Sequence, residues 1–471
     1  MIWWGLRIYK EKLAAMLAAR SAARPPTLSG LRLIRMQQNY YELPSFFCNV
    51  ARTHGPIVRF KNLRSDVYFV NEPSAIEEIL VTKAGSFRKG RGTVRLRRLL
   101  GNGLLTAERP EHLPHRRLVA PAFHKKRLAA YARVMTDATA ACVATWRDGE
   151  TLDIDRELNR LALEIAAKAL FGADLHAEMD TISRSLVQAM EGFPASMLPF
   201  SELWDDWPLP SVRRFKAAKA RLDAIVLRMI EEHRAEGTDR GDVLSMLLGA
   251  RDEEARGGMN DAQIRDEAMT ILLAGHETTA NALAWTFYLL QRNPEVATAL
   301  YAHVDAVLGD RTPTMDDVPQ LDYVRAVLSE TMRLYPPAWM TARRATERVT
   351  VGGYPIERGD IAIVSQYVTH RDPRFWPDAE RFVPQRFLDG STRERFAYFP
   401  FGGGTRTCIG EAFAWAEGIL VIATIAQRVR LESVGDGGDV ATLPLVTLRP
   451  RSAIRARVRA RGRALLQSAR V

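Results

Sequence analysis

The sequence FPFGGGTRTCIGEAF, residues 399–413, places Cys408 in a glycine-rich loop, with Arg406 two residues before it. A thiolate is a soft anionic ligand, and glycines allow the backbone to approach a large planar group closely. The segment EAFAWAEGILVIATIA follows with apolar helical spacing, and the dipole at the start of such a helix favours a thiolate. Cys408 is therefore a candidate metal ligand, and Arg406 is a candidate partner for a carboxylate of the same bound group.

The two remaining cysteines, Cys48 and Cys142, do not extend this site. Both are far from Cys408 in the sequence, neither belongs to a CxxC pair, and both have apolar neighbours. A disulfide framework and a structural zinc site are disfavoured, because both need grouped cysteines. We interpret Cys48 and Cys142 as core thiols in a reducing compartment, and we expect a cytoplasmic location.

The net charge of +11 raises the question of nucleic-acid binding. Residues 449–471 contain eight arginines and no acidic residue. Within them, AIRARVRARG alternates small or apolar residues with arginine, which predicts an edge strand with a basic face toward solvent. No aromatic residues are interleaved for stacking on bases, so we expect no nucleic-acid partner.

No linker, repeat or low-complexity block divides the 471 residues. Residues 56–71 predict two short strands around a polar turn, residues 349–364 predict a hairpin, and most of residues 72–335 has helical periodicity. We expect a mainly α fold with a small β-rich subdomain, organised as an N-terminal extension (1–29) and a single domain (30–471). Charged residues interrupt the start of the chain, so we expect no transmembrane anchor there; a docked helix, a helix lying on a membrane surface and a transit-like segment stay open.

One long helix is predicted between Asn260, a candidate N-cap with Gln263 three residues on, and Pro294, which stops it. Its roughly 32 residues would span about 48 Å and are apolar on most faces, which predicts a helix through the middle of the molecule. AGHETT, residues 274–279, lies at its centre. Small residues and a carboxylate–hydroxyl pair cost stability inside a buried helix and are tolerated mainly at functional sites. We interpret the histidine in this segment, His276, as a core or surface residue on another face of the helix.

The pattern FxxGxRxCxG is complete in the Cys408 loop and resembles the haem-thiolate signature of the cytochrome P450 family. Three further motifs agree in order and spacing: AGHETT resembles the oxygen-activating stretch of the family, ETMR resembles its ExxR motif, and PQRF resembles its PERF motif. The resemblance runs from about residue 30 to about residue 461. It implies the cytochrome P450 fold, with a long central helix and a cysteine-ligand loop.

The resemblance implies a haem b cofactor, iron protoporphyrin IX, with Cys408 as the axial ligand of the iron. Arg406 and Arg343 would contact the haem propionates, with Arg344 as the rival of Arg343. The WxxxR motif of the family aligns with His112 and Arg116, where a histidine replaces the usual tryptophan and Pro114 obscures the helix start. The residues that would contact the cofactor are His112, Arg116, Ala274, Gly275, Arg343, Phe401, Arg406, Cys408 and Gly410.

The centre of the long helix would supply the oxygen chemistry. Thr278 would hold a water or the oxygen substrate near the iron, and Glu277 would relay protons from solvent, so both are candidate catalytic residues. Ala274 and Gly275 would leave the space that dioxygen needs.

The ETMR motif has a structural interpretation. Glu330 and Arg333 lie one helical turn apart, so their side chains share a face. The resemblance implies a buried ion-pair triad with Arg386, although Gln385 replaces the usual glutamate of that motif. A surface ion pair is disfavoured, because LSETMRLYPP is typical of a mostly apolar helix.

The substrate pocket is less visible in the sequence. The residues at the family positions are apolar or small, which predicts a hydrophobic substrate, although the same residue types also make an ordinary core. Basic residues between Arg88 and Arg98 would steer a carboxylate such as that of a fatty acid, but a solvated loop explains them equally well. The expected pocket residues are Leu104, with Leu105 beside it, Ala274, Ala338, Met340 and Val446.

Together these features predict a haem-dependent monooxygenase that inserts one atom of O2 into a hydrophobic molecule of the fatty acid, terpenoid, steroid or polyketide class. Electrons would come from a separate ferredoxin- or flavodoxin-type donor and its reductase. One alternative is a peroxide-driven hydroxylase of the same fold, although such proteins replace the acid–alcohol pair. Another is a non-catalytic haem-thiolate sensor, which would not need Glu277 and Thr278. An acidic donor would dock beside the Cys408 loop, although Arg116 itself would face the haem. The basic residues of this docking cluster are His115, Arg116, Arg117, Lys125, Lys126 and Arg127.

Overall fold

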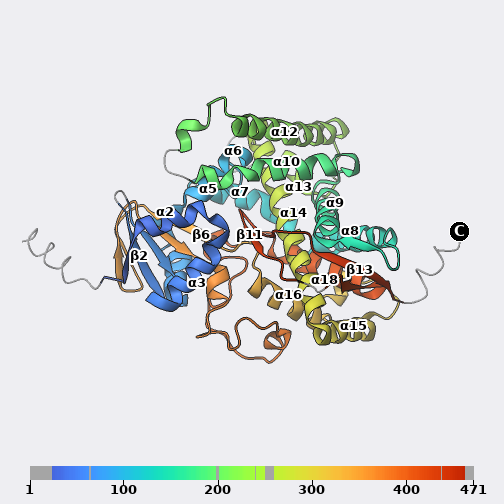
Figure 1. Ribbon diagram of the computed structural model, residues 1–471. Helices are drawn as coiled ribbons and strands as arrows, with labels where there is room; N and C mark the ends of the chain where they lie inside the picture. Colours follow the sequence, from blue (N-terminus) through green and yellow to red (C-terminus); the bar gives the residue numbers. More distant parts are fainter. Residues whose placement is uncertain are drawn as a thin grey trace, which may run out of the picture.

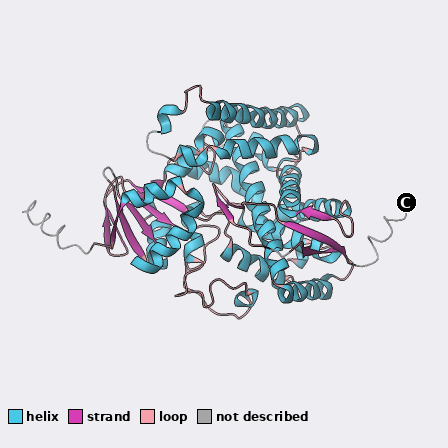
Figure 2. Cartoon of the chain, viewed as in Figure 1, coloured by secondary structure: helices cyan, strands magenta, loops and turns pink. Residues whose placement is uncertain are grey.

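The computed structural model describes residues 24–62, 65–197, 201–238, 240–249, 259–435 and 438–461. Helices dominate this part of the chain, and the largest sheet lies at one side with α2 and α3 next to it (Figure 1, Figure 2). The expected mainly α fold with a smaller β-rich part is therefore confirmed. The helices are α2 (Gly30–Gln38), α3 (Leu43–His54), α4 (Pro73–Glu77), α5 (Arg91–Arg95), α6 (Arg97–Leu100), α7 (His112–Val119), α8 (Lys125–Ala144), α9 (Ile154–Phe171), α10 (Met179–Glu191), α11 (Phe193–Ser196), α12 (Pro210–Glu236), α13 (Val243–Gly249), α14 (Asp261–Arg292), α15 (Pro294–Leu308), α16 (Asp322–Leu334), α17 (Gln366–Thr369) and α18 (Glu411–Arg428).

The largest sheet of the described residues has the strand order β1-β2-β3-β9-β6-β4, and smaller sheets have the orders β10-β13-β5, β11-β12 and β7-β8. The first strand lies within the expected N-terminal extension and pairs in parallel with β2, while residues 1–23 lie outside the described residues. The strands are β1 (Thr27–Ser29), β2 (Ile57–Lys61), β3 (Val67–Val70), β4 (Phe87–Lys89), β5 (Thr151–Asp153), β6 (Thr341–Ala345), β7 (Val349–Val351), β8 (Tyr354–Ile356), β9 (Ile361–Val364), β10 (Val429–Ser433), β11 (Thr442–Pro444), β12 (Leu448–Pro450) and β13 (Arg455–Ala460).

The local strand predictions hold, and one prediction about sheet position fails. The antiparallel pairs β2–β3 and β7–β8 confirm the two turns expected in residues 56–71 and 349–364. The prediction that the arginine-rich strand β13 is an edge strand is wrong, because it lies between β10 and β5. Its basic solvent face is confirmed, since Arg455, Arg457 and Arg459 are exposed and alternate with buried Ala456 and Val458.

The predicted long helix is α14, and it lies in the middle of the helical part (Figure 1). The backbone N–H of Gln263 donates to the Asn260 side chain at 2.9 Å, and the Asn260 N–H donates to the Gln263 side chain at 3.0 Å, which completes a capping box. The helix ends at Arg292, just before Pro294 begins α15. Helices α9, α12, α16 and α18 pack against α14.

The two cysteines outside the Cys408 loop are free and partly buried in the described fold. Burial raises the pKa of Cys48 to about 11 and that of Cys142 to about 12. Both thiols are therefore inert at neutral pH, in line with their interpretation as core residues. Within the described residues, no helix combines the length and the apolar character needed to cross a membrane.

Candidate active site

The Cys408 loop leads directly into α18, as the sequence predicts. The backbone N–H of Cys408 donates to the carbonyl oxygen of Phe401 at 3.0 Å, and Gly410 precedes the first residue of the helix. Burial in protein raises the pKa of the Cys408 thiol to about 11, while a hydrogen bond from the Gly410 backbone acts in the opposite direction. The side chain nevertheless has accessible surface. Cys408 is therefore a thiol that other atoms can reach, unlike the two partly buried cysteines.

The glycines of this loop approach protein atoms, which the sequence did not indicate. Gly404 has a φ of +69°, and a Cβ there would lie 2.1 Å from the carbonyl oxygen of Leu80. A Cβ on Gly403 would lie 2.5 Å from the ring of Phe396. The expectation that the glycines admit a planar cofactor is therefore not met at these two positions, where Leu80 and Phe396 take the space.

The middle of α14 is less buried than the rest of its central part. Residues 267–273 and 279–290 of this helix are all buried, but Ala274 is exposed and Gly275 and Thr278 are half-buried. These three residues lie on one face, because positions four apart in a helix are neighbours. The Thr278 hydroxyl donates to the carbonyl oxygen of Ala274 at 2.6 Å. The small residues therefore leave one polar hydroxyl, that of Thr278, accessible within an otherwise buried stretch of the helix.

Glu277 lies on a different face of α14 and is already paired. The hydroxyl of Thr447 and the Nε of Arg449 both donate to its Oε1, with 2.8 Å between the Arg449 and Glu277 atoms. Burial alone would raise the pKa of Glu277, but the charge of Arg449 and these hydrogen bonds outweigh burial and hold it below the ordinary value. Sequence analysis missed Thr447 and Arg449, because only the folded chain places the 442–450 hairpin next to α14.

The core interpretation of His276 is confirmed. Its side chain is buried, and Nε2 lies 2.7 Å from Oδ1 of Asn159 in α9. Burial lowers its pKa to about 4, so the imidazole is neutral at physiological pH. His276 therefore packs α14 against α9.

The predicted propionate contacts belong to a cationic cluster, formed by Lys89, His112, Arg343 and Arg406. The Nη2 atom of Arg406 lies 2.6 Å from Oε2 of Glu108. Burial, followed by the charge of Arg406, lowers the pKa of Arg343 to about 10, that of Lys89 to about 7 and that of His112 to about 4. A cluster in which cations depress one another's pKa has capacity for further negative charge.

Sequence analysis missed the contribution of Lys89 to this cluster. Its ammonium group is buried and donates to the carbonyl oxygens of Leu105 and Ala107 at 2.5 and 2.7 Å. The alternative residue Arg344 points elsewhere, because it is exposed and donates to the carbonyl oxygen of Gly359 at 3.3 Å. Adjacent residues on a strand face opposite sides, so Arg343 belongs to the cluster and Arg344 does not.

The structure brings Glu330, Arg333 and Arg386 together. Arg333 donates to both carboxylate oxygens of Glu330 at 2.7 and 2.8 Å, and Arg386 donates to Oε1 at 3.2 Å. The side chains of Glu330 and Arg333 are fully buried. Arg333 also donates to the carbonyl oxygens of His370, Ala379 and Arg381. These contacts tie α16 to the loop that precedes the Cys408 segment, which is a structural role.

The expected pocket residues come from three neighbouring segments. Ala338 is exposed, Met340 and Val446 are half-buried, and Leu104 is buried. The indole N–H of Trp339 donates to the carbonyl oxygen of Leu445 at 3.0 Å, which holds the 338–340 segment next to Val446. The backbone N–H of Leu104 donates to Glu267 of α14 at 3.0 Å. Leu104 and the hairpin that carries Val446 are therefore bonded to α14, and the 338–340 segment is bonded to that hairpin.

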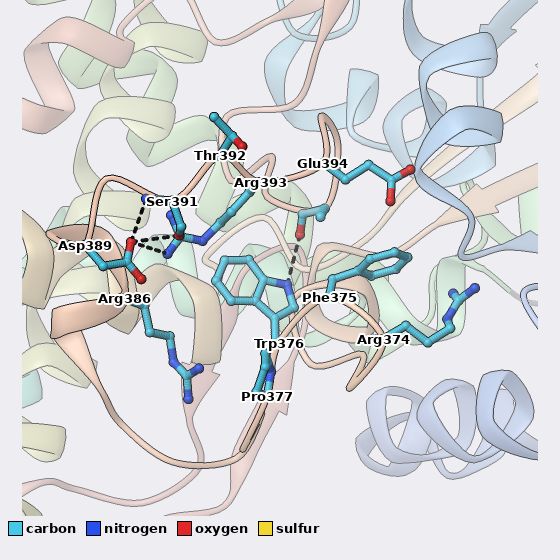
Figure 3. Close-up of a pocket in the computed structure, with 11 residues that line it drawn as sticks. Arg374, Phe375, Trp376, Pro377, Arg386, Asp389, Ser391, Thr392, Arg393 and Glu394 are labelled. Carbon is cyan, nitrogen blue, oxygen red and sulfur yellow. Dashed lines mark hydrogen bonds and ion pairs between the residues drawn. The ribbon is translucent and has the colours of Figure 1, made fainter.

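Two cavities lie away from these residues. One, of about 440 Å³, is lined by residues of the 374–397 loop with Trp376 among them (Figure 3). The indole N–H of Trp376 donates to the carbonyl oxygen of Ala397 at 3.2 Å, and Asp389 accepts hydrogen bonds from Ser391. The other, of about 120 Å³, lies between α6, α10 and α12. Neither cavity is lined by Cys408 or by the accessible residues Ala274, Gly275 and Thr278 of α14.

The expected docking cluster is only partly on the surface. Including His115 in it is wrong, because this side chain is buried and its Nδ1 lies 2.7 Å from Oε1 of Glu267. Arg116 donates to the carbonyl oxygen of Thr407 at 2.7 Å, and Arg127 donates to that of Gly241. Arg117 and Lys126 are exposed. The side chain of the remaining member, Lys125, lies outside the described part of the structure.

Comparisons with known proteins match almost the whole chain. The sequence model of the family described as Cytochrome P450 matches residues 25–454. Cyclooctatin synthase of Streptomyces melanosporofaciens is 40% identical over 410 residues, which cover 86% of this chain and 89% of that protein. Cyclooctat-9-en-7-ol 5-monooxygenase of the same organism is 37% identical over 395 residues, covering 83% and 86%. Pentalenene oxygenase of Streptomyces avermitilis is 32% identical over 422 residues, covering 89% and 93%.

Proposed function

This chain belongs to the cytochrome P450 family, and we propose that it is the monooxygenase of a cyclic terpenoid. Two of its relatives are named as oxygenases, and the family uses haem and normally takes electrons from separate redox partners, so the chain is a haem-dependent monooxygenase. When bound, the haem supplies the iron at which dioxygen is activated. A ferredoxin- or flavodoxin-type donor and a cytoplasmic location stay predictions.

The described residues fit a haem, and the cationic cluster is the observation that supports the fit. Lys89, His112, Arg343 and Arg406 lie close enough to depress one another's pKa, with Glu108 the acid that acts on this group. Two propionates would supply the missing negative charge. We assign Cys408 as the axial ligand, because its side chain is accessible and lies two residues from Arg406 of that cluster.

Within the site, we assign Thr278 the handling of protons. Thr278 is half-buried in the accessible middle of α14. Its hydroxyl already donates to the Ala274 carbonyl, so its oxygen is free to accept a hydrogen bond from a water. A hydroxyl placed in this way passes a proton without carrying a charge itself. Glu277 is the neighbouring acid, and its pairing with Arg449 keeps it ionised.

We expect Thr278→Ala to consume reductant at a rate comparable to the wild type but to form about 10- to 100-fold less hydroxylated product, with the difference appearing as hydrogen peroxide. Product and peroxide are measured together in one reaction. Thr278→Ser is the matched control, because it keeps the hydroxyl, and should retain most of the coupling. Thr279 is unsuitable as a control, since it is buried and acts on Glu417 of α18. Normal coupling in Thr278→Ala would contradict the assigned role.

The terpenoid class follows from the lining and from the relatives. The names of two relatives specify pentalenene and cyclooctat-9-en-7-ol. The expected lining residues are apolar or small, which suits a hydrocarbon skeleton. Three of the basic residues that would steer a fatty acid are instead engaged with acids: Arg91 pairs with Glu202 at 2.8 Å, and Arg95 and Arg98 pair with Asp205 at 2.5 and 3.0 Å.

We expect cyclic terpene hydrocarbons and alcohols to shift the spin state of the haem, because an apolar ligand displaces water from the pocket. Fatty acids with the same number of carbon atoms are the matched comparison and should bind at least about 10-fold more weakly, since an apolar pocket must desolvate their carboxylate. Optical titration of the purified haem protein gives both affinities. Tighter binding of the fatty acids would rule out the terpenoid assignment.

A further inference from the structure

The hairpin formed by β11 and β12 is attached to α14 along one face of the helix. Glu277, Asn281 and Trp285 are spaced four residues apart, so they lie one above the other. Thr447 and Arg449 bind the carboxylate of Glu277, the Asn281 side chain donates to the Thr447 hydroxyl at 3.0 Å, and the Trp285 indole donates to the Leu448 carbonyl at 3.0 Å. Three consecutive hairpin residues therefore meet three successive turns of α14.

The first of these contacts is electrostatic and largely shielded from water. The side chains of Arg449 and Glu277 are 15% and 7% exposed, so their attraction is much stronger than that of a surface pair. The groups that act on this pair are His276 from α14, the Thr447 hydroxyl from the hairpin and Asp155 from α9. His276 is neutral at physiological pH, which leaves Arg449 as the cation that balances Glu277.

The same hairpin carries a residue expected to line the substrate pocket. Val446 directly precedes Thr447 and is half-buried, and Leu445 accepts the hydrogen bond of Trp339. A substrate that presses on Val446 would therefore move a chain segment that is bonded to Glu277 one and three residues later. In the same way, any movement of Glu277 must first break its contacts with that segment.

We propose that Arg449 is a positioning residue for the reaction, which holds the carboxylate of Glu277 against the substrate-contacting hairpin and so couples the acid to pocket occupancy. This inference rests on the proposed function, in that it takes Val446 as a pocket residue and Glu277 as the acid beside Thr278. It adds a residue that acts through Glu277 and touches neither substrate nor cofactor. It also gives the hairpin a part in proton supply as well as in substrate contact.

Arg449→Gln tests the proposal in the haem-loaded protein. We expect the coupling of reductant to product to fall by at least about 10-fold at neutral pH and to become pH-dependent, because Glu277 loses the cation that keeps it ionised. Arg449→Lys keeps the charge and should restore a large part of the coupling. Arg459→Gln, which removes an exposed partner of Glu432, is the matched control and should behave like the wild type.

Two further measurements separate a positioning role from a structural one. Without substrate, hydrogen–deuterium exchange of residues 442–450 should be faster in Arg449→Gln than in the wild type. Adding substrate should slow this exchange less in Arg449→Gln than in the wild type. Glu277→Gln/Arg449→Gln should couple no worse than Glu277→Gln alone, because Arg449 acts through Glu277. Additive losses in the double variant would overturn the proposal. So would a wild-type coupling ratio and pH profile in Arg449→Gln, whatever its stability.

The proposed function can fail separately from this inference. Normal coupling in Thr278→Ala would remove the assigned oxygen chemistry, whereas the result for Arg449→Gln bears on how Glu277 is held. If Arg449→Gln does not fold with haem, Arg449→Lys and the Glu277→Gln background still decide the question. In that case, wild-type exchange of the hairpin in Glu277→Gln, which removes the charge that Arg449 binds, would overturn the proposal.

Discussion

Cys408→Ser is expected to abolish the red-shifted band of the ferrous–CO complex and to lose most of the bound haem. A serine hydroxyl is a harder and much weaker donor to iron than a thiolate, and its proton is removed far less easily. The residues around it also offer no substitute, since the other cysteines, Cys48 and Cys142, are core thiols in other elements. Haem content and the CO difference spectrum of the purified variant measure both effects.

Cys142→Ser provides the matched control for this experiment. Cys142 lies near the end of α8, is partly buried and is free, so its loss removes a thiol without touching the Cys408 loop. Its CO spectrum should be that of the wild type. An unchanged spectrum in Cys408→Ser, or the same loss in both variants, would show that another group ligates the iron.

Features with local signals could be predicted from the sequence. The ends of α14 follow from Asn260, Gln263 and Pro294, which lie at the helix termini themselves, and the observed helix runs from Asp261 to Arg292. The two hairpins follow from alternation and turn residues within a few positions. The triad is similar, because Glu330 and Arg333 share one turn of α16. In each case the interacting residues are neighbours in the chain, or the motif contains them.

Features that depend on distant segments could not be predicted in this way. Whether β13 is an edge strand depends on β5, which comes from a much earlier part of the chain. His115 looks like one more surface cation in the sequence, but the fold turns it toward Glu267. The glycines at 403 and 404 indicate that other atoms approach the backbone closely, but the sequence does not show that these atoms belong to Phe396 and Leu80. The type of a residue determines its chemistry, and the fold determines which other residues it contacts.

The same limit applies to the candidate site. Cys408 and Arg406 are visible in one motif, and Arg343 could be aligned with it, but Lys89 joins the cationic cluster only through the pairing of β4 with β6. The partners of Glu277 are also distant, since Thr447 and Arg449 lie in the C-terminal hairpin. A buried acid in the middle of a helix implies a partner, because an unpaired charge there is costly. The sequence alone does not show that the partner is Arg449.

Glu417→Gln is expected to remove a strong pH dependence of stability. Glu417 lies in α18 and is completely buried, and its carboxylate oxygens have no well-formed hydrogen bond within the described structure. Burial raises its pKa from an ordinary 4.5 to about 8, while the Thr279 side chain acts weakly in the opposite direction. None of the charged groups described on the helices and strands packed against α18 contributes to this shift. The folded protein therefore keeps a neutral carboxylic acid at this position at neutral pH.

The sign of the effect follows from proton binding. Between pH 4.5 and about 8 the folded protein holds a proton on Glu417 that the unfolded chain has released, so the free energy of unfolding falls as the pH rises through this range. A shift of this size corresponds to about 5 kcal/mol over the whole range. Glutamine is neutral at every pH and nearly isosteric, so the variant should match the wild type near pH 4.5 and be more stable than it by several kcal/mol near pH 8.

Denaturant unfolding of the haem-loaded protein, followed by far-UV circular dichroism at a series of pH values, measures this difference directly. Glu432→Gln is the control, because it removes an exposed glutamate and leaves α18 intact. Parallel stability curves for Glu417→Gln and the wild type would mean that Glu417 is ionised in the folded protein and has a counter-charge that the described contacts lack. Stability curves that coincide near pH 4.5 and separate toward pH 8 would instead establish that Glu417 of α18 is a neutral acid in the folded protein, next to Thr279 of α14. Because the folded protein keeps this acid neutral, the wild type should match Glu417→Gln near pH 4.5 and lose stability relative to it as the pH rises toward the raised pKa.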